Sequence, residues 1–199
     1  MSSSFAFRFP RALFAASGAF SPGANDNASG VGVVLALAEH FAIQPIEDLQ
    51  IEVLITTAEE TGMHGARVFA KTLDPGTPCH VLTFDMVGTG GDLRYAVRDG
   101  TWRALRFSEQ MNTSIRQAIP GSATLWYIEK SGDHAPFIEA GFPVAALQVT
   151  GSPTAELRYH SADDTPDYIE LRAVQKAVAA ALAVISDLTN SSSFSSNGR

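Results

Sequence analysis

The chain has 199 residues, of which 45% are hydrophobic and 18% are charged, and its formal net charge is −7 at pH 7. This length and composition are typical of one globular domain with a buried core. The negative charge and the lack of a basic cluster argue against a nucleic acid or an anionic membrane as a partner. No apolar run in the sequence is long enough to span a membrane.

Two features bear on the cellular compartment. The single cysteine, Cys79, excludes an intrachain disulfide and leaves the redox environment undetermined. The first 20 residues combine two arginines with a short apolar patch at 12–16, which resembles a signal peptide only faintly, because the patch is short and cleavage would fall almost on the first motif. We therefore predict no signal peptide: the chain as written would be cytoplasmic, and it would be secreted if its N-terminus is truncated.

Apolar periodicity alternates between strand and helix along the chain. Strands are predicted around residues 5–14, 51–57, 80–84, 124–128 and 143–149, and helices around 31–41, 66–70, 102–119 and 168–188. This alternation predicts one domain over residues 1–189 with an α/β fold, a three-layer α/β/α sandwich around a central, mixed but mostly parallel sheet. The Ser-rich tail at 190–199 has little to bury and is expected to be disordered.

Two adjacent glutamates, Glu59 and Glu60, follow the predicted strand at 51–57. Neighbouring carboxylates repel each other unless a cation separates their roles. A metal ion does so when one glutamate binds it and the other moves protons. Taken alone, the pair fits equally well two solvated acids that open a helix, where the helix dipole favours negative charge.

Three further residues follow predicted strands: Asp26 in a small-residue turn, Asp85 at the end of an apolar run, and His160. Each has an ordinary structural explanation as a turn residue, a helix cap or a loop residue. In a parallel sheet, however, the strand ends meet at one edge. Three carboxylates and an imidazole at that edge predict a zinc site formed by Asp26, Glu60, Asp85 and His160, with Glu59 as general base.

Five blocks in a fixed order carry a family resemblance: PGANDNASG, AEETG, FDMVG, SGDHAPF and YHSADDT. Over about residues 21–188 the chain resembles the M28 family of zinc-dependent exopeptidases. The resemblance implies a pair of zinc ions bridged by Asp26, one of them completed by Glu60 and His160 and the other bound by Asp85. It also implies that Glu59 takes a proton from the attacking water.

The resemblance implies two more local features. The peptide bond after Asp26 is often cis in this family. Asp133 and His134 in SGDHAPF resemble a Ser-Asp-His block beside the substrate pocket, with one glycine inserted. These two residues would line the pocket, bind a substrate oxygen or pack a loop. Asp163 would orient His160, or it is only a turn acid.

The chain also departs from the family pattern. The second zinc needs a histidine from a His-x-Asp motif upstream of the bridging aspartate, yet no histidine precedes His40, and Phe-Ala-Ala-Ser stands at 14–17 where the motif is expected. Either the N-terminus is truncated or this half of the site has decayed. The zinc held by Asp26, Glu60 and His160 keeps three protein ligands and an open fourth position, the usual catalytic arrangement.

The resemblance therefore implies a zinc-dependent exopeptidase, an aminopeptidase, that binds one or two zinc ions and acts on a peptide or amino-acid derivative. We expect low or absent activity, because the second zinc lacks a ligand. The alternatives are a single-zinc acyltransferase like glutaminyl cyclases and an inactive, peptidase-like binding scaffold. Missing early strands would expose a sheet edge and favour a homo-oligomer.

Overall fold

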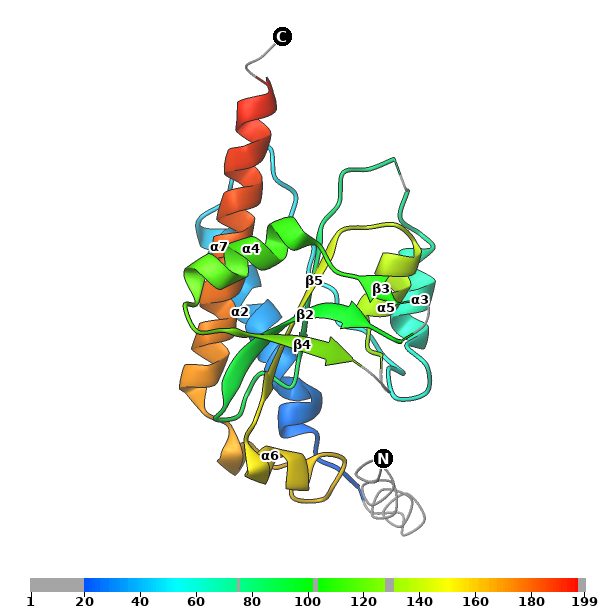
Figure 1. Ribbon diagram of the computed structural model, residues 1–199, viewed down its shortest axis with the longest axis vertical. Coiled ribbons are helices and arrows are strands. Elements are labelled where there is room, and N and C mark those ends of the chain that lie inside the picture. The colour runs from blue at the N-terminus through cyan, green and yellow to red at the C-terminus, as the bar shows by residue number, and fades with distance from the viewer. Residues whose placement is uncertain (1–19, 75, 102–103, 128–130, 197–199) are drawn as a thin grey trace.

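The computed structural model describes residues 20–74, 76–101, 104–127 and 131–196 (Figure 1). Its centre is a mixed sheet in the strand order β1-β5-β2-β3, in which β4 also pairs with β2. Strand β1 runs parallel to β5, and β2 runs parallel to β4 but antiparallel to β5 and β3. The strands are β1 (Val81–Asp85), β2 (Asp92–Asp99), β3 (Leu105–Arg106), β4 (Ala123–Tyr127) and β5 (Val144–Thr150).

Helices cover both faces of this sheet, which gives the three layers expected from the sequence (Figure 1). On one side α2, α4 and α7 pack together and against the sheet, and on the other side α3 and α5 do so. The longer helices are α2 (Ser29–Ile43), α4 (Glu109–Ala118) and α7 (Leu171–Ser196), and the shorter ones are α3 (His64–Ala70), α5 (His134–Glu139), α6 (Pro153–Arg158), the π-helical turn η1 (Ala24–Ala28) and the 3-10 turn η2 (Pro166–Tyr168).

The sequence explains the packing of the first helical layer. In α4 the side chain of Ser108 caps the helix by accepting a hydrogen bond from Met111 N. Met111 and Ile115, one helical turn apart, are fully buried. In α7 buried alanines recur at helical spacing from Ala173 to Ala181, and their small side chains let this helix lie close to α2 and α4.

Several elements differ from the sequence-based expectation. Residues 51–57 are extended but form no strand, and Ile55 is 52% exposed. The prediction of a buried strand was wrong because a strand needs a paired neighbour, and none of the described strands pairs with this segment. The strand predicted at 5–14 falls outside the described residues. Strand β2 was not predicted, because its charged residues at 92, 94, 98 and 99 mask the apolar alternation.

Two helices also differ in their limits. The helix predicted from residue 102 begins at Glu109, and Leu105 instead belongs to β3, paired with Asp99. Helix α7 continues to Ser196, where the Ser-rich tail was expected to be disordered. Among the described residues, no helix is long and apolar enough to cross a membrane.

Candidate metal centre

The turn that carries Asp26 is fixed by hydrogen bonds from distant parts of the chain. The buried carboxylate of Asp164 accepts bonds from the backbone N–H groups of Asn25 (2.8 Å) and Asp26 (3.0 Å). The Asn27 side chain donates to Phe84 O at 2.8 Å and accepts from Met86 N at 3.2 Å. The Asp26–Asn27 peptide bond is cis, as the family resemblance implied. The turn is thereby joined both to the end of β1 and to the loop after His160.

Close approach between α2 and β1 requires a glycine at position 30. A Cβ atom on Gly30 would lie 2.4 Å from Phe84 O and 2.5 Å from Asn27 Oδ1, whereas one on Gly32, in the same helix, would meet nothing within 4 Å. We expect Gly30→Ala to lower the free energy of unfolding by about 1–3 kcal/mol through overpacking. Gly32→Ala, the control, should raise it by roughly 0.5–1 kcal/mol. Urea unfolding of both variants measures this, and equal stabilities would contradict the described contact.

Glu59 and Glu60 lie in a turn between the extended segment 51–57 and α3. The carbonyl of Glu59 accepts bonds from Gly62 N (2.9 Å) and Met63 N (2.8 Å). Glu59 is half-buried, while Glu60 is exposed at the surface of the site. Non-glycine residues with left-handed backbones flank the site: Ala58 (φ 58°) precedes Glu59, Met86 (φ 53°) follows Asp85, and His160 has φ 55°. Such backbones tend to gather at functional sites.

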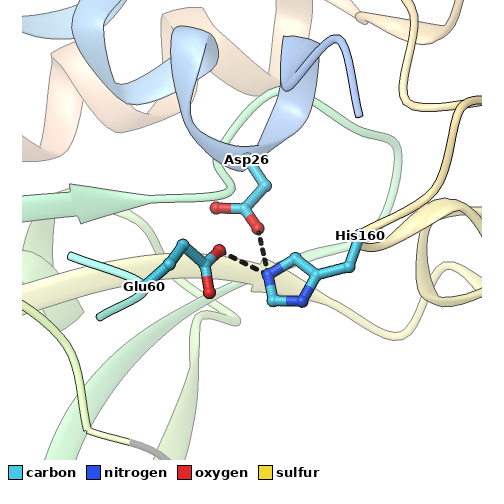
Figure 2. A group of neighbouring side chains, drawn as sticks. All are labelled: Asp26, Glu60 and His160. Carbon is cyan, nitrogen blue, oxygen red and sulfur yellow. Dashed lines mark hydrogen bonds and ion pairs between the residues drawn. The ribbon is translucent and has the colours of Figure 1, made fainter. Parts of the chain in front are cut away.

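Asp26, Glu60 and His160 come together from three separate parts of the chain (Figure 2). Each offers one ligand atom, and these atoms lie within 4.8 Å of one another. His160 Nε2 is 3.1 Å from Asp26 Oδ2 and also contacts Glu60 Oε1. The ring of Tyr159 stacks on the His160 ring at 3.8 Å between centroids, which restrains the imidazole.

This geometry fits a zinc ion. Tetrahedral ligands with bonds of about 2.0–2.1 Å lie about 3.3 Å from one another, close to the 3.1 Å between the imidazole and the Asp26 carboxylate. One histidine and two carboxylates are donors that zinc accepts, and three protein ligands leave one position open. All five histidines of the chain are in the described residues, and among them only His160 belongs to this cluster.

Asp85 lies at the end of β1, beside the three clustered residues but outside their compact group. Burial, together with the charges of Asp26, Glu59, Glu60 and Asp133, raises the pKa of Asp85 to about 8. A buried acid among four others is stabilised in its ionised form only by a nearby positive charge. Asp85 is therefore suited to face a cation, and its part in binding zinc stays a prediction.

The pKa of Asp85 has a consequence for stability. Without metal, the native chain holds this proton up to about pH 8, whereas the unfolded chain releases it near 3.8, the ordinary pKa of an aspartate. The free energy of unfolding should therefore fall as pH rises between these values, by up to about 1.4 kcal/mol per pH unit. Zinc should reverse the trend, because metal ligands bind in their deprotonated form.

Thermal melts from pH 5 to 8.5, with chelator and with zinc, test this expectation. In the metal-free chain, Asp85→Asn should reduce the fall of the melting temperature with rising pH. Any pH dependence that comes from other groups should remain. A metal-free melting temperature that rises steadily across this range would contradict the raised pKa of Asp85.

Asp133 and His134, from the block SGDHAPF, lie in different surroundings. Asp133 is half-buried and accepts a hydrogen bond from the Thr56 hydroxyl; burial raises the pKa of its carboxyl. His134, only 3% exposed, lies in the interior and contacts Asp99 instead of an open surface. The structure thus places Asp133 close enough to Asp85 for its charge to act on that carboxyl, while His134 lies in the interior.

Two site residues were missed in the sequence. Asp164 holds the Asp26 turn, whereas the sequence singled out Asp163, either as a support for His160 or as a turn acid; the Asp163 backbone donates to Ser161 Oγ at 3.2 Å and accepts from Thr165 N at 2.9 Å. Asp99, bound to His134, lies at the end of the unpredicted strand β2. The two adjacent acids at 163 and 164, close to His160 in the sequence, could have indicated that one of them supports the site. No feature of the sequence around Asp99 pointed to its contact with His134.

Comparison with known proteins agrees with the fold and identifies the family. The chain belongs to peptidase family M28, whose family model matches residues 13–185. It is 31% identical over 173 residues to aminopeptidase YwaD of Bacillus subtilis strain 168, a match that covers 79% of this chain and 36% of that protein. The chain thus spans about a third of the length of this curated relative.

Solved structures give the same picture. The zinc aminopeptidase BSAP from Bacillus subtilis superposes with a TM-score of 0.68 at 29% identity, covering 83% of this chain and 42% of that one. A glutaminyl cyclase from an Acidobacteriales bacterium superposes with a TM-score of 0.58 at 20% identity, covering 82% of this chain and 61% of that one. At this lower identity the second likeness concerns the fold alone.

Proposed function

We propose that the chain is a zinc-dependent exopeptidase that removes amino acids from the N-terminus of a peptide. The observation that carries this proposal is the convergence of Asp26, Glu60 and His160 within 4.8 Å, with Glu59 next to Glu60 in the same turn. Membership of peptidase family M28 and the likeness to zinc aminopeptidases support it.

The residues divide the work as follows. Asp26, Glu60 and His160 would hold the zinc ion. When bound, zinc supplies Lewis acidity, which polarises the scissile carbonyl and makes water a nucleophile near neutral pH. Glu59 takes a proton from the attacking water and delivers it to the leaving amine. Glu59 is half-buried and directly precedes Glu60, so it lies next to the clustered donors without being one of them.

The rate should be low in this chain. Asp26 and Asp85 provide only carboxylates for a second zinc, and the one described histidine beside them, His160, is already assigned to the first zinc. A second ion would then bind weakly, and the hold on a substrate's amino group would weaken with it. A robust metal-dependent aminopeptidase rate from the pure chain would contradict this part of the proposal.

A substrate comparison separates the proposed function from its alternative. A single-zinc acyltransferase of the glutaminyl-cyclase kind also fits a site with one histidine and two carboxylates. Incubation of the zinc-loaded chain with an aminoacyl-anilide and with a peptide that begins with glutamine, both followed by mass spectrometry, distinguishes them. Release of the anilide's amine supports the exopeptidase, and cyclisation of the glutamine supports the acyltransferase. Neither product, with zinc bound, would point to a binding scaffold.

A further inference from the structure

A buried polar group lies directly behind the turn of Glu59. His134 and Asp99 are 3% and 7% exposed, and His134 Nε2 is 3.1 Å from Asp99 Oδ2. The Ser131 hydroxyl donates to the same carboxylate oxygen at 2.5 Å. Because a carboxylate only accepts hydrogen bonds, Nε2 of His134 carries the proton of this contact. The other ring nitrogen, Nδ1, then remains to face a different neighbour.

The orientation of the imidazole is fixed by packing. The His134 ring lies 4.8 Å from the Tyr127 ring and 5.0 Å from the Phe107 ring, between centroids. Asp99 lies on β2, opposite Tyr127 of β4 in the sheet register, so the carboxylate that holds the imidazole is itself on a rigid strand. Aromatic contacts and the hydrogen bond to Asp99 together restrain the orientation of this ring.

Nδ1 of His134 and the carboxylate of Glu59 both lie near Gly132. A Cβ atom on Gly132 would lie 3.3 Å from His134 Nδ1 and 3.9 Å from Glu59 Oε1. Both atoms therefore lie within 4 Å of the point where a side chain at residue 132 would begin, and a methyl group there would be tight against the imidazole. Since Gly132 does not have a left-handed backbone, conformation alone does not explain a glycine at this position.

We propose that His134, held by Asp99, is a positioning residue for Glu59. The fixed imidazole borders the space at Gly132 and limits the orientations of the Glu59 carboxylate, so that Glu59 stays aimed at the attacking water. This role rests on the proposed function of Glu59 as general base.

Two variants test the proposal in different ways. Gly132→Ala places a methyl group in the space and removes no polar group. Asp99→Asn keeps the shape of the side chain but removes the charge that orients the imidazole. Gly32→Ala is the matched control, because it adds the same methyl group on an exposed helix face where nothing lies within 4 Å.

Three quantities are measured on the zinc-loaded full chain: the zinc affinity, the affinity for leucine hydroxamate, and kcat and KM for an aminoacyl-anilide. The hydroxamate binds zinc and places a hydroxyl group beside the general base. For Gly132→Ala and Asp99→Asn we expect zinc affinity within about twofold of wild type. We expect hydroxamate affinity and kcat to be lower by about tenfold or more, the scale of outer-sphere effects at metal sites, with KM changed much less.

The other outcomes overturn the inference in distinguishable ways. If both variants bind hydroxamate like wild type, His134 does not position Glu59, and the proposed function is unaffected. If zinc affinity falls as much as hydroxamate affinity, the His134–Asp99 pair stabilises the whole metal site and does not position Glu59 in particular, which contradicts the inference. If the wild-type chain binds zinc but neither hydroxamate nor anilide, the proposed function fails, and the role of His134 fails with it.

Discussion

Replacing Glu59 with glutamine is expected to lower kcat for an aminoacyl-anilide by about 10²–10⁴-fold, the usual contribution of a general base. Glutamine keeps the size of the side chain but accepts no proton at neutral pH. Because Glu59 is not among the three clustered ligands, zinc affinity should stay within a few-fold of wild type. An anilide assay with a large excess of chain over substrate measures even a low rate.

The control for this prediction is Glu47→Gln, which removes one exposed carboxylate away from the site and should leave kcat unchanged. Two results would contradict the role assigned to Glu59. One is a Glu59→Gln rate equal to that of wild type with zinc bound. The other is a loss of zinc in parallel with the rate, which would make Glu59 a ligand.

Replacing His160 with alanine is expected to weaken zinc binding by more than about 100-fold. Loss of a partner that only orients a ligand already weakens metal binding by about 10–100-fold, and His160 is itself one of the three clustered donors. The variant should still fold without metal, because His160 is a partly exposed loop residue and α6 and η2 on either side do not depend on its side chain. Competition with a chromophoric chelator gives the zinc affinity.

His40→Ala is the matched control, since His40 lies near the C-terminal end of α2 and takes no part in the cluster. Its zinc affinity should equal that of wild type. Equal zinc affinities for His160→Ala and wild type would show that the tight site lies elsewhere in the chain.

Much of the fold was open to prediction because apolar periodicity marks buried elements. The predictions near β1, β4 and β5, and those of α2 and α3, agree with the structure to within a few residues, as does the start of α7, which then runs beyond its predicted end. The mixed sheet in three layers is also confirmed. The predictions that failed concern segments whose structure depends on pairing with distant strands. Residues 51–57 have the β-branched, apolar composition of a strand but pair with none of the described strands, and β2 is a strand because β4 and β5 pair with it.

The candidate site was also predicted only in part. The sequence motifs pointed to Asp26, Glu60 and His160, and the structure brings these three together, although their part in catalysis stays a prediction. Sequence spacing could not show that His134 points inward to Asp99, because that contact joins residues 35 apart through the fold. Asp164 was overlooked for a similar reason, since its partners lie at the other end of the chain. Formation of a homo-oligomer stays a prediction, which light scattering tests.

The number of zinc ions bound per chain tests the account most directly. The purified chain is stripped with chelator, titrated with zinc and analysed for bound metal after removal of weakly held ions. We predict one tightly bound zinc per chain, lost in His160→Ala and retained in Asp85→Asn. No tight zinc, or one that survives the loss of His160, would contradict a metal centre built from Asp26, Glu60 and His160.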